Sequence, residues 1–147
     1  MPSNAYLHQR VELSSAGALL MLHAAVAKAE AIGVPQCIAI VDRGGHCLAF
    51  VRMDGAKVLS EHSATRKAIS AVSSNAATGA VAEVHGQKLA LATDGVFTNL
   101  PGGLPIVLSG QLVGGIGVGS GTGDQDRIVA EAAIESLQAA VGGAEAI

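Results

Sequence analysis

The pattern of apolar and polar residues divides the chain into helical and extended segments in a definite order. The first helical segment follows Ser14, a good N-cap residue, and runs to about Ile32, where Gly33 and Pro35 prevent its continuation. Its residues are apolar on nearly every side, which indicates a helix that is buried on more than one side. We therefore expect part of this helix to lie between subunits of an oligomer.

Short apolar runs after this helix predict strands joined by tight turns. Two hairpins are expected, 36–42 with 46–53 and 104–108 with 111–118, and the run over 96–100 predicts a further short strand. The run over 36–42 is apolar on both of its alternating faces, which is typical of a strand covered on both sides. The sheet should therefore lie between two helical layers.

The remaining segments predict further helices. Ser60 is expected to cap a helix that reaches about Ser73, with alanines on the packing side and polar residues on the other side. Residues 80–92 predict short helical pieces broken at Gly86, and residues 124–141 predict a last helix ended by Gly142 and Gly143. Residues 1–12 are expected to form an arm, and the residues after Gly143 a loose tail.

A glycine-rich stretch joins the last predicted strand to the last helix. Six glycines lie between Gly114 and Gly123, and Thr122 with Gln125 forms a capping box. Backbone N–H groups of Gly121, Thr122, Gly123 and Asp124 would then point toward one spot and could hold an anion. Alternatively, the glycines let a helix pack closely on a strand or let a second subunit approach. The spacing matches neither the dinucleotide fingerprint nor the Walker motif.

Composition narrows the function classes. Half of the 147 residues are hydrophobic, only 2% are aromatic and 14% are charged, so apolar faces are expected to be buried in a homo-oligomer. The net charge of −3 argues against a nucleic-acid partner, and neither a secretory signal nor an apolar run of about 18 residues for a membrane span is expected. Cys37 should face Arg52 across the first hairpin and Cys47 should face Asp42. Two unpaired thiols fit a cytoplasmic protein.

Two blocks of sequence resemble the GlcG/HbpS family, which includes the C-terminal domain of PduO-type corrinoid adenosyltransferases. They are VPQCIAIVDRGGHCLAFVRMDGA over 34–56 and PGGLPIVLSGQLVGGIGVGSGTGDQD over 101–126. The resemblance implies one domain over 1–147, an α/β (α+β) fold, and a profilin-like three-layer α/β/α sandwich with a five-stranded antiparallel sheet. It also places residues 52–56 at the pocket, and Lys67-Ala68 matches a pair that is frequent in the family.

The resemblance favours a cytoplasmic, oligomeric protein that binds a small ligand, with haem or a related tetrapyrrole as the ligand. His23 is the candidate haem ligand, His8 competes with it, and the alternative for His23 is a core or interface histidine. A haem pocket usually contains aromatic residues, and this chain has few. The candidate ligand-binding residues are Arg52, Asp54, Gly102, Gly103, Gly121, Thr122, Gly123 and Asp124.

An enzyme is the alternative function, an isomerase or tautomerase that acts on a small carboxylate or oxo acid in a catabolic pathway. Arg66 or Lys67 would hold the carboxylate, and Glu61 or His62 would move a proton. Equally, these four residues are expected if this helix face is simply solvated, with local ion pairs. A further reading is an accessory domain without adenosyltransferase activity. If the chain is an enzyme, Arg66→Ala or Lys67→Ala should remove activity or substrate binding and leave the oligomer intact, because both side chains are expected to be partly exposed.

Overall fold

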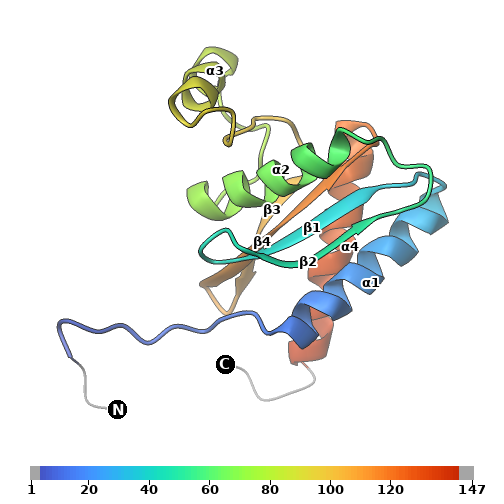
Figure 1. The fold of residues 1–147 in the computed structure, drawn as a ribbon. Coiled ribbons are helices and arrows are strands. Elements are labelled where there is room, and N and C mark those ends of the chain that lie inside the picture. Colours follow the sequence, from blue (N-terminus) through green and yellow to red (C-terminus); the bar gives the residue numbers. More distant parts are fainter. Residues whose placement is uncertain (1–3, 143–147) are drawn as a thin grey trace.

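A four-stranded antiparallel sheet organises residues 4–142, the part of the chain that the computed structural model describes. The strands lie in the order β2-β1-β4-β3, so two sequential hairpins meet along the central pair β1–β4 (Figure 1). The elements in chain order are α1 (Ser15–Ile32), β1 (Cys37–Asp42), β2 (Cys47–Arg52), α2 (Ser60–Ser74), α3 (Glu83–Ala92), β3 (Gly103–Leu108), β4 (Gln111–Gly119) and α4 (Gly123–Gly142).

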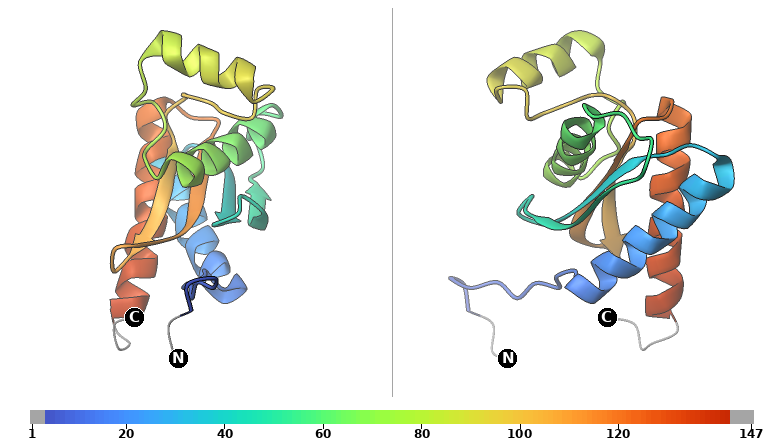
Figure 2. Two further views of the ribbon diagram at one scale, coloured as in Figure 1. Left: turned by 90° about the vertical axis from the view of Figure 1, so that its left-hand side faces the viewer. Right: turned by 45° about the vertical axis from the view of Figure 1, so that its right-hand side comes forward.

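Helices cover both faces of the sheet, as the doubly apolar first strand predicted. α1 and α4 pack on one face and α2 packs on the other (Figure 2). In β1, Ile38 and Ile40 point into the core beneath α1 and α4, while Cys37, Ala39 and Val41 contact the α2 side. The observed architecture is therefore a three-layer α/β/α sandwich.

The predicted fifth strand over 96–100 is wrong, because this segment has no regular secondary structure and does not pair with the sheet. Side-chain oxygens satisfy its backbone instead. The Phe97 N–H donates to Thr93 Oγ1 at 2.9 Å, and the Thr98 N–H donates to Ser70 Oγ at 2.9 Å. These bonds hold the segment against the end of α3 and against α2. They satisfy backbone N–H groups that would otherwise pair with a neighbouring strand.

Two helix boundaries also differ from the predictions. Ser60 is the first residue of α2 rather than its cap, because Leu59 occupies the cap position without a side-chain bond. α3 runs through Gly86 as one helix, where the missing side chain lets Asn99 approach. α3 also stands apart from the sandwich (Figures 1 and 2), and its Val84 and Leu91 are exposed.

The predicted ends of α1 are confirmed. The Ser14 hydroxyl accepts a hydrogen bond from the Gly17 N–H, and Gly33 closes the helix with a left-handed φ of 71°. By length and composition α1 could cross a membrane, a test that the core helix of a soluble protein also passes. The expectation that no apolar segment reaches that length is therefore wrong. Residues 4–14 form an arm before α1 (Figure 1), which is exposed except at Val11 and Leu13, where it packs against the core. The predicted tail and residues 1–3 lie outside the described residues.

The first hairpin largely follows its predicted register. Cys37 faces Arg52 as predicted, but a register shift between Ile40 and Val41 places Cys47 opposite Val41 rather than Asp42. Both cysteines are unpaired, as expected. At the turn, N–H groups of His46 and Gly44 donate to the Asp42 carboxylate and hold its pKa below the usual range.

Glycines of β3 and β4 bring α2 into backbone contact with the sheet. A Cβ on Gly117 would overlap the Ala64 carbonyl oxygen, one on Gly115 would lie 2.5 Å from the Ala68 oxygen, and one on Gly103 would overlap the Lys67 oxygen. The alternative that the glycines serve close helix packing is therefore confirmed for this part of the glycine-rich stretch. This close packing sets the distance between the side chains of α2 and the end of β4.

Candidate functional site

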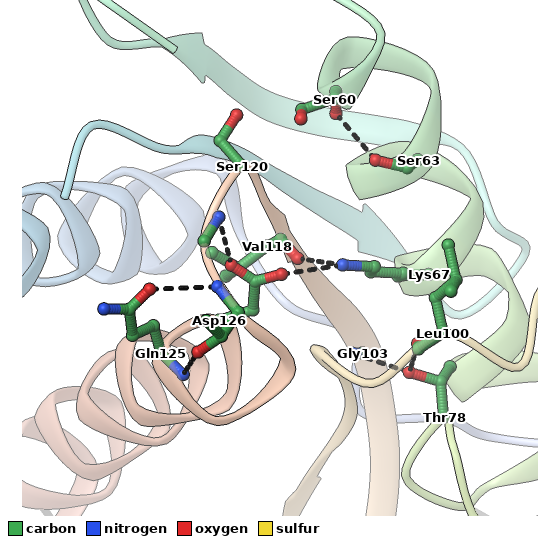
Figure 3. Close-up of polar contacts among 12 residues, drawn as sticks. Ser60, Ser63, Lys67, Thr78, Leu100, Gly103, Val118, Ser120, Gln125 and Asp126 are labelled. Carbon is green, nitrogen blue, oxygen red and sulfur yellow. Dashed lines mark hydrogen bonds and ion pairs between the residues drawn. The ribbon is translucent and has the colours of Figure 1, made fainter. Parts of the chain in front are cut away.

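A cleft lies where β4 ends and α4 begins, across from the first turns of α2 (Figure 3). We call it the α4 cleft, and its volume is about 230 Å³. Its lining residues come from three segments of the chain and are mostly polar or glycine: Lys57, Ser60, Ser63, Lys67, Leu100, Pro101, Ser120, Gly121, Gly123 and Asp126.

A buried ion pair forms the inner wall of the α4 cleft. The Lys67 ammonium lies 2.9 Å from Asp126 Oδ2, and the two side chains are only 5% and 3% exposed. Lys67 Nζ also donates to the Val118 carbonyl at 2.8 Å, as Figure 3 shows. The prediction of a partly exposed Lys67 is therefore wrong. The reason is that Lys67 lies on the alanine face of α2, which packs on the sheet.

The second oxygen of Asp126 is bonded as completely as the first. It accepts from the Gly121 N–H at 2.9 Å and from the Gln36 amide at 2.8 Å, in the amide orientation that satisfies both neighbours. The same amide group of Gln36 donates to the Gly119 carbonyl at 2.6 Å. Asp126, on α4, therefore bonds to α2, to the residue before β1 and to the β4–α4 connection.

Sequence reasoning assigned no role to Gln36 and gave Asp126 only a helix-dipole role. Gln36 directly precedes a strand that is apolar on both faces. A polar side chain there cannot face water, and this could have indicated that it has a buried hydrogen-bond partner. For Asp126, the available signal was the spacing to Val129 and Ala130, which places it on the buried side of α4.

The predicted capping box at the start of α4 is confirmed. The Thr122 N–H donates to Gln125 Oε1 at 2.9 Å, and the Gln125 N–H donates to Thr122 Oγ1 at 3.2 Å. Thr122 and Asp124 are exposed and do not line the α4 cleft, whereas Gly121 and Gly123 do. The Gly121 N–H already donates to Asp126, so within residues 4–142 Gly123 is the one member of the predicted set that lines the cleft without such a bond.

Gly102 and Gly103 lie beneath the cleft instead of lining it. Gly102 has a φ of 122°, and a Cβ there would lie 3.1 Å from Lys67 Nζ and 2.8 Å from the Cβ of Asp126. The absence of a side chain at Gly102 thus makes room for the ion pair. Their role is structural support of the cleft, rather than direct contact with a ligand.

The proposed acid–base residues of α2 are not brought together. Glu61, His62 and Arg66 are exposed, and none of them lines the α4 cleft, whereas Lys67 does.

Burial raises the pKa of the nearby Cys37 thiol, which therefore stays protonated and is a poor nucleophile. Within residues 4–142, no group of three or more His, Cys, Asp and Glu side chains is placed to hold a metal ion.

The other predicted ligand residues line a second site, beside α1 and β2. Two adjoining hollows of about 430 and 590 Å³ share Val26, Glu30 and Val51, and we call them together the α1–β2 groove. His23 lines the first hollow, while Arg52 and Asp54 line the second. The full lining is Leu22, His23, Val26, Ala27, Ala29, Glu30, Gly33, Val34, Pro35, Val51, Arg52, Met53 and Asp54.

His23 is exposed in the chain, so the expectation of a core histidine is wrong, and an interface role stays a prediction. The candidate ligand residues thus divide between two sites. His23, Arg52 and Asp54 belong to the α1–β2 groove, and Lys67, Gly121 and Gly123 belong to the α4 cleft.

Comparison with known proteins supplies the family. The family model described as "Haem degrading protein HbpS-like" matches residues 13–135. A Citrobacter freundii protein, described as an uncharacterized 15.0 kDa protein of the dhaT–dhaS intergenic region, is 37% identical over 86% of this chain and 93% of its own length. The solved structure of HbpS has a TM-score of 0.79 and 38% identity over 92% of this chain and 96% of that one.

The solved structure of a PduOC–haem complex has a TM-score of 0.80 and 30% identity, over 86% of this chain and 95% of that chain. In these comparisons both the sequence and the three-layer fold agree over nearly the whole described region. The chain therefore belongs to the HbpS-like family.

Proposed function

We propose that this chain is an oligomeric, cytoplasmic small-ligand-binding protein and that its ligand is haem or a related tetrapyrrole. The observation that carries the proposal is the position of His23, an exposed histidine on the wall of a largely apolar groove. None of the other four histidines, all within the described part of the chain, lines the α1–β2 groove or the α4 cleft. The haem complex of PduOC, a structural relative, adds support.

The residues of the α1–β2 groove fit the chemical needs of a haem. Haem iron takes a nitrogen ligand from histidine, which His23 offers from α1. Val26, Val51 and Met53 supply apolar contact for the macrocycle, and Arg52 offers a cation suited to a propionate. Few aromatic residues are available, so aliphatic side chains would provide most of the contact.

A haem titration of the full chain tests this assignment. The wild type should give a Soret band that saturates at a fixed haem-to-chain ratio, and His23→Ala should abolish the saturable band because the iron loses its ligand. His62→Ala is the matched control, since His62 is exposed on α2 and lines neither site. An unchanged titration in His23→Ala, or an equal loss in His62→Ala, would rule out this ligand.

The oligomeric part of the proposal rests on exposed apolar side chains. Leu19 and Leu20 of α1 are 51% and 40% exposed, and Val84 and Leu91 of α3 are 64% and 81% exposed. Burying such groups between subunits would stabilise an assembly. Light scattering at micromolar concentration should therefore give a mass that is a multiple of 14.6 kDa. A single-chain mass would contradict the proposal.

Two further features support ligand binding in the cytoplasm over the enzymatic alternative. Cys37 and Cys47 are both free thiols, which suits a reducing compartment. Glu61, His62 and Arg66 are spread over a solvated helix face, so acid–base catalysis on an oxo acid has less support than ligand binding.

A further inference from the structure

The Ser60 hydroxyl is a buried polar group that lacks a protein partner. Ser60 is 7% exposed, and the hydrogen bonds of residues 4–142 include its carbonyl, which accepts from Ser63 Oγ at 3.5 Å, but not its hydroxyl. Every fully enclosed side-chain polar atom of the described residues has a partner. The Ser60 hydroxyl must therefore reach open space, and the space that Ser60 lines is the α4 cleft.

The buried ammonium of Lys67 also has bonding capacity to spare. A lysine ammonium has three donors, and two of them are used, by the Val118 carbonyl and the Asp126 carboxylate. Lys67 is among the residues that line the cleft, so its remaining donor is available there. Ser60 and Lys67 thus offer two donors on one side of the cleft, both from α2 (Figure 3).

The opposite side of the cleft favours negative charge. Gly121 and Gly123 line it at the start of α4, where the helix dipole attracts anions; the Gly121 N–H itself already donates to Asp126. The Asp126 carboxylate already accepts three hydrogen bonds and is paired with Lys67. The remaining formal charge among the lining residues is the ammonium of Lys57, so the cleft has one uncompensated positive charge.

Size sets the upper limit for the ligand. The cleft volume of about 230 Å³ lies below the roughly 300–1,000 Å³ of pockets that hold drug-sized molecules. A single positive charge matches a monoanion better than a dianion such as phosphate, which would also meet the nearby Asp126 carboxylate. A carboxylate can accept hydrogen bonds from a hydroxyl and an ammonium at once.

We propose that the α4 cleft is a binding site for a short-chain monocarboxylate, held by Ser60 and Lys67 from α2 and by the start of α4. This site lies between α2 and the start of α4, shares no lining residue with the α1–β2 groove, and is independent of haem binding. It places the ligand against the buried ion pair, in a part of the chain to which haem binding assigns no role.

Titration of the ¹⁵N-labelled full chain with sodium acetate tests the site directly. With chloride replacing acetate at constant ionic strength, the amide signals of Gly121 and Gly123 should shift saturably with acetate only. Ser60→Ala should weaken acetate binding about tenfold or more, because a hydrogen bond to a charged group is lost. Ser73→Ala, an exposed serine at the other end of α2, is the matched control and should match the wild type.

The same titration separates this proposal from its competitors. At a pH where inorganic phosphate is mainly the dianion, it should bind more weakly than acetate. Haem titration of Ser60→Ala should match the wild type. Equal shifts with chloride, an unchanged acetate affinity in Ser60→Ala, or tighter binding of phosphate than of acetate would overturn the monocarboxylate site. A loss of haem binding in His23→Ala with acetate binding intact would support the independence of the two sites.

Discussion

Replacing Lys67 with methionine is expected to lower the free energy of unfolding by about 3–5 kcal/mol, because it leaves the Asp126 carboxylate buried without its counter-charge. Methionine keeps an unbranched, apolar side chain that reaches as far as the lysine Cε, with sulfur in place of Cδ, and it lacks the ammonium group. The effect should be large because Asp126 is 3% exposed and cannot be solvated without opening the junction of α2 with α4. Urea denaturation at a fixed protein concentration measures the difference.

Arg66→Met provides the matched control for Lys67→Met. Arg66 is the preceding residue on α2 and is exposed, so its replacement should change the free energy of unfolding by no more than about 0.5 kcal/mol. Equal, small losses in both variants would show that the buried ion pair contributes little.

Gly117→Ala should destabilise the chain by about 3 kcal/mol or more, although it adds a single methyl group. The new Cβ would overlap the carbonyl oxygen of Ala64 in the backbone of α2, and Ala68 N would lie 2.5 Å away. A backbone atom cannot move aside as a side chain can, so the whole helix would have to lift off the sheet. The change should appear as a lower midpoint in thermal and urea unfolding.

Gly142→Ala is the control for added volume. A Cβ at this position meets nothing within 4 Å, so the change in the free energy of unfolding should stay within about 1 kcal/mol and favour the alanine variant through helix propensity. A Gly117→Ala variant as stable as wild type would mean that α2 does not rest on the backbone of β4.

Features governed by local chemistry were predictable from the sequence. Ser14 and Gly33 set the ends of α1, the Thr122–Gln125 capping box opens α4, and Ser109-Gly110 closes the second hairpin. Each depends on residues that are neighbours in the chain. The prediction of a strand over 96–100 was wrong for the opposite reason. The hydroxyl groups of Thr93 and Ser70 accept hydrogen bonds from the backbone of this segment, and the position of Ser70 is known only from the folded chain.

Some residues of the candidate sites could be predicted from the sequence, but not which of them lie together in the fold. Lys67 lies three residues after Ala64 and four before Ala71, on the packing face of α2, so its burial could have been recognised from helical spacing. Its partner could not, because Asp126 is 59 residues away and the pairing depends on how α2 meets α4. The division of Arg52 and Gly121 between two sites likewise depends on the sheet order.

The central pairing of β1 with β4 has a consequence for how the chain is made. β1 begins at Cys37 and its inner partner β4 ends at Gly119, while α1 packs on α4, which is the last helix. During synthesis the first hairpin therefore emerges from the ribosome with a doubly apolar strand and an open edge well before its partners exist. A nascent chain of this kind depends on protection from aggregation until the last quarter of the protein has been translated.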